Sequence, residues 1–206
     1  MQLLNKKDIE VSLASSHPNT LFIDPLLDQE QIGNVTVDLR LGYDFFVSIL
    51  TRKPFIEVLA TDPKNNRGIA SFFQETRRDI SDRFILYPNQ VVLTTTLEYV
   101  SLPSNVYADV LTRSSYTRLG IHLNTMIQPG FRGCVPLELV NHGNNAIELV
   151  VGSKICQVRL FKLAEESPYH ESSDSRKYFG DVRPVLSKAE SDKDLDILSK
   201  IQTAKP

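Results

Sequence analysis

Hydrophobic residues recur at every second position through most of the chain after residue 34. This alternation is typical of β-strands that turn one face to a core and the other to solvent. Turns rich in Pro, Gly and Asn separate the segments, and no helix-length pattern alternates with them, so a Rossmann-type parallel sheet is not expected. We predict many short strands in an antiparallel sandwich or barrel. The segments are VTVDLRLG, FILYPNQVVLTTTLEYVSL, VYADVL, CVPLELV, AIELVV and KICQVRLFKL.

Three regions depart from the strand pattern. Residues 1–33 contain a short helix that Asn5 is expected to cap, followed by a lead-in to the first long strand segment. Residues 52–82 are predicted to form an insertion of loops with a short helix. Residues 164–206 form a polar tail that ends in an amphipathic helix pattern, with Leu195, Leu198 and Ile201 on one face.

Composition excludes several function classes. Lys and Arg number 23 against 25 Asp and Glu, so the net charge of -2 provides no global field for nucleic acid or a membrane surface. No window approaches about 18 uninterrupted apolar residues, and the N-terminus lacks an apolar signal segment. We expect a soluble, cytoplasmic protein with a local anion site. Cys134 and Cys156 lie in apolar strand segments without metal-ligand spacing, and we expect buried thiols.

A local basic cluster lies between residues 111 and 139. Arg113, Arg118 and Arg132 are concentrated there, and the hydroxyls of Ser114 and Ser115 follow the first arginine directly. Arginine forks and hydroxyl donors suit a polyphosphate. Composition alone favours the alternative, a solvated turn that carries ordinary surface arginines.

Glu138 is the candidate proton-transfer group. In CVPLELV, Val135, Leu137 and Leu139 alternate with the other positions, so Glu138 points away from the core. Its carboxylate either faces solvent or lies in a partly dry pocket, where desolvation would raise its pKa toward a range useful for catalysis.

Five collinear segments resemble the dCTP deaminases, which share the β-fold of the trimeric dUTPases. That family carries patterns similar to ATVDLRLG, LxPGExxLxxTLExVxLP, GRSSLARLG, IDPGFxGxxxLELxN and a late Y…AKYxxQ. This chain has VTVDLRLG at 35–42, LYPNQVVLTTTLEYVSLP at 86–103, TRSSYTRLG at 112–120, IQPGFRGCVPLELVN at 127–141 and Tyr169 before RKY at 176–178. The resemblance implies a single mainly-β domain over residues 1–206, a distorted antiparallel β-barrel or jelly roll.

The resemblance also implies roles for individual residues. Glu138 corresponds to the catalytic glutamate, and Ser114 to the hydroxyl that helps hold the attacking water. Substrate-binding positions implied by the match are Arg113, Ser115, Arg118, Gln128, Pro136, Tyr169 and Lys177.

The implied reaction is hydrolytic deamination of dCTP to dUTP and ammonia. A homotrimer with sites between subunits is expected, acting on nucleotides of the dCTP, dUTP and dTTP type. Mg²⁺ would accompany the substrate triphosphate. No protein metal site is expected, because the H-x-E and P-C-x-x-C ligands of zinc deaminases are absent and the four histidines are scattered.

The chain departs from the family pattern at three places. Gln128 replaces the usual Asp, and a neutral amide cannot accept the proton of a water that attacks a phosphate, which disfavours dUTP hydrolysis. The hairpin at 119–127 is shorter than in the family, and the tail glutamine near Asp181 is missing. Two alternatives therefore stay open: a dUTP diphosphatase, alone or coupled to deamination, and a non-catalytic nucleotide-binding homologue.

Overall fold

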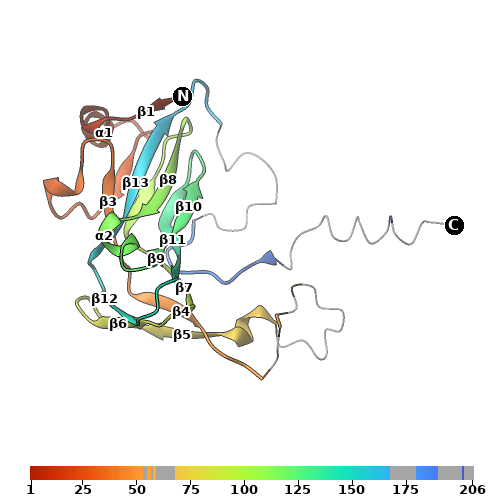
Figure 1. Cartoon of the computed structure of the whole chain (residues 1–206). Coiled ribbons are helices and arrows are strands. Elements are labelled where there is room, and N and C mark those ends of the chain that lie inside the picture. The colour runs from red at the N-terminus through yellow and green to blue at the C-terminus, as the bar shows by residue number, and fades with distance from the viewer. Residues whose placement is uncertain (53–54, 57, 59–67, 168–179, 190–200, 202–206) are drawn as a thin grey trace.

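The computed structural model describes residues 1–52, 55–56, 58, 68–167, 180–189 and 201. Two antiparallel sheets dominate it (Figure 1). One contains, in spatial order, β1 (Gln2–Leu3), β13 (Lys154–Lys162), β8 (Val106–Thr112) and β10 (Asn124–Ile127), while β3 (Val37–Arg40) also pairs with β13. The other runs β5 (Phe73–Arg77), β4 (Asp44–Ser48), β7 (Val91–Ser101), β11 (Arg132–Asn141) and β9 (Ile121–His122), with β2 (Phe22–Asp24) on β7. The mainly-β prediction is confirmed; the sheets do not close into a barrel, and their arrangement is that of a jelly roll.

A small third sheet pairs β6 (Arg83–Leu86) with β12 (Ile147–Val150) at the bottom of the view in Figure 1. The segments that period-two alternation predicts form the strands β3, β6, β7, β8, β11, β12 and β13. The prediction did not include β1, β2, β4, β5, β9 and β10, and β5 lies inside the region 52–82. That region does contain the expected short helix, the 3-10 helix η2 (Ile69–Phe72). The expectation that the rest would be loops is wrong at Phe73–Arg77, because pairing with β4 gives this polar segment its strand hydrogen bonds.

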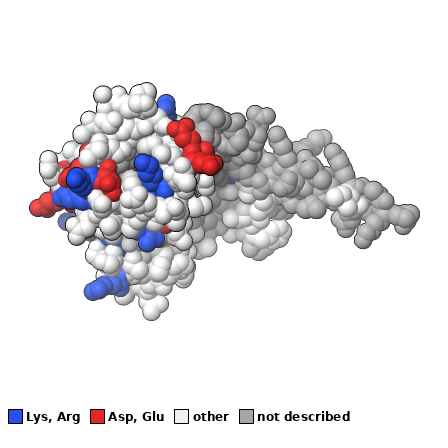
Figure 2. All heavy atoms as spheres, turned by 90° about the horizontal axis from the view of Figure 1, so that it is seen from above, with Lys and Arg blue, Asp and Glu red and all other residues white. Residues whose placement is uncertain are grey.

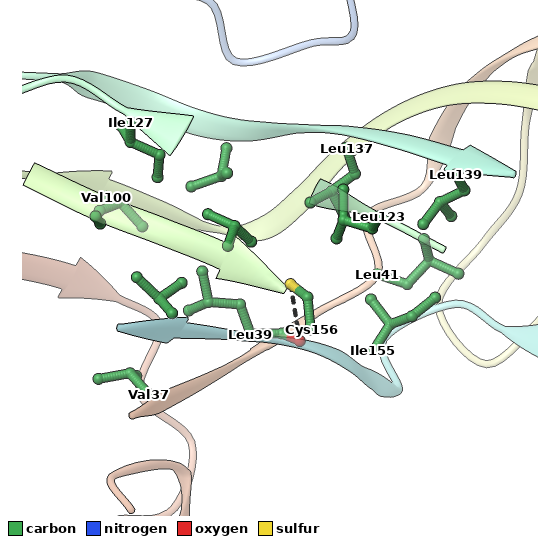
Figure 3. Packing of buried hydrophobic residues seen from close by; sticks show 14 of the residues in the cluster. Val37, Leu39, Leu41, Val100, Leu123, Ile127, Leu137, Leu139, Ile155 and Cys156 are labelled. Carbon is green, nitrogen blue, oxygen red and sulfur yellow. Dashed lines mark hydrogen bonds between the residues drawn. The ribbon is translucent and has the colours of Figure 1, made fainter. Parts of the chain in front are cut away.

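The core lies between the two larger sheets. Val110 of β8, Leu160 of β13 and Leu139 of β11 are each fully buried, while their sequence neighbours face outward. Figure 3 shows Leu137 and Leu139 extending from β11 into this apolar layer. The alternation seen in the sequence therefore corresponds to an inner and an outer face on each strand.

Helix α1 (Lys6–Leu13) confirms the predicted N-terminal helix and its cap. The Asn5 side chain accepts a hydrogen bond from the Asp8 backbone N–H at 3.1 Å, and the Asp8 carboxylate accepts one from the Asn5 N–H at 3.2 Å. This reciprocal capping box satisfies donors that the first helical turn leaves free. Ile9 buries the inner face of the helix against the sheets. Of the predicted C-terminal helix, Leu195 and Leu198 lie outside the described residues.

A buried ionic network joins the two sheets beneath the 3-10 helix η1 (Gln29–Gln31). The Glu98 carboxylate accepts hydrogen bonds from the Arg40 backbone N–H at 2.8 Å, the Arg40 guanidinium at 3.0 Å and the Gln31 amide at 3.2 Å. Arg40 also contacts Asp28 at 3.0 Å, and Asp28 pairs with Lys154 at 3.1 Å. Every partner of the buried Glu98 carboxylate thus comes from a distant part of the sequence.

Charged side chains of both signs are interspersed on the face shown in Figure 2, with no large patch of one sign. This distribution agrees with the nearly neutral composition. Among the residues that the structure describes, no helix is long and apolar enough to cross a membrane.

Candidate active site

Glu138 lies near the middle of β11, between β7 and β9. Val135, Leu137 and Leu139 are fully buried on the inner face, and Glu138 points outward, as the alternation predicts. Glu138 lines two cavities, one bordered by β10 and the other by β7 and residues 181–187. The structure therefore resolves the alternative left open by the sequence: the side chain keeps solvent contact but is also part of a walled pocket.

The first cavity, of about 220 Å³, lies between β11 and the hairpin strand β10. Gln128 and Pro136 line it together with Glu138, so three of the predicted site residues meet here. The other lining residues are Thr125, Met126, Ile127 and Phe131. Apolar walls with a few convergent polar groups are typical of a small-molecule pocket.

The second cavity is bordered by the segment 181–187, which begins beside the start of β11. The Gly180 N–H donates to the Arg132 carbonyl at 3.0 Å, and the Cys134 N–H donates to the Asp181 carbonyl at 3.1 Å. These main-chain bonds hold the segment against the strand, and Arg183 adds an ion pair with Asp44 at 3.4 Å. Glu138, Cys134, Asp181 and Arg183 are among the residues that line the resulting cavity.

Burial by these walls raises the pKa of the Glu138 carboxyl above its ordinary range. A hydrogen bond with the Thr125 side chain opposes that shift, because it stabilises the ionised carboxylate. A carboxyl group with a raised pKa is better able to both accept and return a proton than an ordinary surface carboxylate. Thr125 lies in strand β10, and no motif in the sequence identified it as a site residue.

The arginine and serine cluster forms the turn between β8 and β9. Arg113 is the N-cap of the short helix α2 (Ser114–Thr117), and Ser114, Ser115 and Arg118 are exposed around it. The turn is anchored from beneath, since the Tyr116 hydroxyl bonds to Ser153 at 3.2 Å. Three exposed polar side chains on an anchored turn form a surface that can accept a phosphate group.

In the described part of the chain, the basic turn lines neither of the two cavities at Glu138. Among the described residues, those that line the two cavities at Glu138 include none of Arg113, Ser114, Ser115 and Arg118. The remaining predicted contacts, Tyr169 and Lys177, lie outside the described residues. A single chain thus presents a carboxylate pocket and a separate basic turn.

Within the described part of the chain, no three His, Cys, Asp or Glu side chains gather as a metal site. His122 and His142 do approach each other, with ring centroids 5.1 Å apart. Asp38, the carboxylate that contacts the basic turn, already engages Arg113 and Gln157 through its two oxygens.

The sequence matches the family model described as dCTP deaminase-like over residues 3–163. A protein of Methanobrevibacter smithii named "dCTP deaminase, dUMP-forming" is 34% identical over 200 residues, which cover 95% of this chain and 99% of that protein. A protein of Methanosphaera stadtmanae with the same name is 36% identical over 201 residues, covering 95% of this chain and 98% of its own length.

The fold is also similar to the crystal structure of 2'-deoxycytidine 5'-triphosphate deaminase from Agrobacterium tumefaciens. The two structures superpose with a TM-score of 0.56 at 23% sequence identity, over 77% of this chain and 47% of the other. The jelly-roll arrangement, the extent of the family match and the identity to whole relatives agree. The chain belongs to the dCTP deaminase-like family.

Proposed function

We propose that this protein is a dCTP deaminase that replaces the C4 amino group of cytosine with oxygen from water, using Glu138 as both base and acid. The observation that carries the proposal is the position of Glu138 where two cavities meet, with a pKa raised by burial. A carboxyl group in such a setting can take a proton and return it within one catalytic cycle. The names of the similar proteins support dCTP as the substrate.

The proton transfers balance with this single residue. The Glu138 carboxylate removes a proton from water as the oxygen adds to C4, and the resulting carboxylic acid protonates N3. The regenerated carboxylate then takes the proton of the new C4 hydroxyl and delivers it to the amino group, which leaves as ammonia. The carbonyl at C4 forms as the C–N bond breaks, so dCTP and water give dUTP and ammonia, with Glu138 unchanged.

Binding of the triphosphate is assigned to the turn with Arg113, Ser115 and Arg118, and Ser114 is assigned to the attacking water. Because this turn lines neither cavity at Glu138 in the described part of one chain, we propose a homotrimer in which the turn of one subunit faces the Glu138 pocket of its neighbour. Mg²⁺ bound to the triphosphate would neutralise part of its charge. The mechanism assigns no role to zinc.

Two observations differ on whether the reaction ends at dUTP or continues to dUMP. The similar archaeal proteins are named dUMP-forming, which favours a further step that cleaves dUTP to dUMP and pyrophosphate. Gln128 lines the pocket where a proton acceptor would be needed, and its amide cannot act as a general base. We favour deamination that ends at dUTP, and the coupled reaction is the second candidate.

The test is to incubate the protein with dCTP and Mg²⁺ and to measure ammonia, dUTP, dUMP and pyrophosphate together. Wild type should release ammonia with an equal amount of dUTP, and Glu138→Gln should lower the rate by about a hundredfold or more. Formation of dUMP with pyrophosphate would favour the coupled reaction instead. Tight dCTP binding without ammonia release would contradict catalysis and indicate a nucleotide-binding homologue.

A further inference from the structure

The Arg113 side chain is fixed by contacts within its own chain. Its guanidinium donates a hydrogen bond to the Lys154 carbonyl at 3.3 Å and lies 3.4 Å from the Asp38 carboxylate. Its backbone N–H donates to the Ile155 carbonyl at 3.0 Å. Arg118, on the same turn, is exposed, so the two arginines of the basic turn are held to different degrees.

A bulge in β13 supplies the carbonyl groups for these contacts. The pairing of β13 with β3 shifts between Lys154 and Cys156, which leaves Ile155 as the extra residue. A bulge turns backbone groups away from the regular ladder. Here the carbonyls of Lys154 and Ile155 both accept hydrogen bonds from Arg113, so the irregularity in one strand fixes a residue at the end of its neighbour β8.

Asp38 is itself held rigidly. Its side chain is only 11% exposed, and its second oxygen accepts a hydrogen bond from the Gln157 amide at 3.1 Å. The backbone carbonyl of Asp38 accepts another from Gln31, also at 3.1 Å. A carboxylate fixed at both its backbone and its side chain constrains the guanidinium that it contacts.

We propose that Asp38 is a positioning residue that orients Arg113 toward the triphosphate, an inference that rests on the proposed function. Asp38 and the Lys154 carbonyl hold one side of the guanidinium and leave other N–H donors for phosphate oxygens. Ordering a long side chain before the ligand arrives removes part of the entropy cost of binding. Asp38 therefore strengthens nucleotide binding without touching the nucleotide.

Whether removing Asp38 weakens or tightens triphosphate binding distinguishes a positioning role from simple charge repulsion. The Asp38 charge lies close to the phosphate-binding turn, and repulsion alone would make its removal tighten the binding of a triphosphate. Positioning of Arg113 has the opposite sign, because an unrestrained guanidinium must be ordered by the ligand. Loss of affinity on removal of Asp38 is the outcome that the geometry requires.

The experiment is a double-mutant cycle on Asp38 and Arg113, in a Glu138→Gln background that prevents turnover. Calorimetric titration with dCTP and Mg²⁺ should show binding weakened about three- to tenfold by Asp38→Ala. The same change should have no further effect once Arg113→Ala is present, because it acts through that arginine. Deoxycytidine, which lacks phosphates, should bind the single variants and the parent alike.

Asp38→Asn keeps the shape and one acceptor oxygen and should give an intermediate affinity, which guards against misfolding of the alanine variant. The matched control is Glu148→Gln, which breaks a carboxylate–arginine pair with Arg83 on the separate β6–β12 sheet and should leave dCTP affinity unchanged. Tighter binding, additive losses in the cycle, or an Asp38 effect that disappears without Mg²⁺ would each overturn the positioning role. If the Glu138→Gln parent binds no dCTP, the proposed function fails instead.

Discussion

Truncation of Glu98 tests how strongly the buried ionic network holds the two sheets together. The residue is fully buried, and its carboxylate accepts from the Arg40 backbone, the Arg40 guanidinium and Gln31. Glu98→Ala removes all three interactions at once. Arg40, whose side chain is 8% exposed, keeps only its contact with Asp28 at 3.0 Å among these charged partners.

The magnitude follows from those contacts. Breaking a buried ion pair by removing one partner costs about 3–5 kcal/mol of unfolding free energy, because the remaining charge stays buried. The Asp28 contact of Arg40 reduces that cost, so we expect about 3 kcal/mol for Glu98→Ala. Burial raises the pKa of Glu98, which means that the charged form is costly in the folded protein. Glu98→Gln, which is neutral and keeps one acceptor, should therefore cost less, about 1–2 kcal/mol.

Urea unfolding followed by circular dichroism measures both values, with the slope of the transition compared among variants to confirm that the extent of unfolding is unchanged. Thr94→Val is a control that removes a buried side-chain hydrogen bond without touching the network, since the Thr94 hydroxyl donates to the Asp44 carbonyl. A loss below about 1 kcal/mol for Glu98→Ala, or a glutamine variant less stable than the alanine variant, would refute the reasoning.

Three further predictions concern the site and its surroundings. Glu138 must be ionised to act as a base, and its pKa is raised, so kcat/KM should fall as the pH decreases through a value above the ordinary carboxyl range. Thr125→Val removes an interaction that lowers this pKa and should shift the fall to higher pH. A steady-state pH profile of each protein measures both effects. In the native protein a thiol reagent should leave Cys156 unmodified, because the Cys156 thiol is completely buried and its pKa is raised. Peptide mapping should detect any labelling at the half-buried Cys134. Equal labelling of the two cysteines would contradict the packing. Gly120→Ala should lower the unfolding free energy by about 2 kcal/mol or more, because φ is 102° and a Cβ would lie 2.6 Å from a backbone nitrogen of the opposite loop; an unchanged urea midpoint would rule out this strain.

Local chemistry in the sequence was sufficient for the long strands of both sheets and for the N-terminal helix. The alternation in CVPLELV placed Glu138 on the outer face of a strand, and Asn5 marked the start of α1, because periodicity and capping depend on residues a few positions apart. The polar segment 73–77 shows the limit of such patterns, since its strand hydrogen bonds are supplied by β4. Propensity could not reveal a strand whose stability depends on a partner distant in sequence.

The sequence by itself predicted which residues would carry the chemistry, through the collinear motifs around Arg113 and Glu138. Only the tertiary structure decided their surroundings. The walls that raise the pKa of Glu138 come from β10 and from residues 180–189, and Asp38 reaches Arg113 across the sheet. Desolvation and side-chain orientation depend on which segments lie close in space, and no short-range pattern records that proximity.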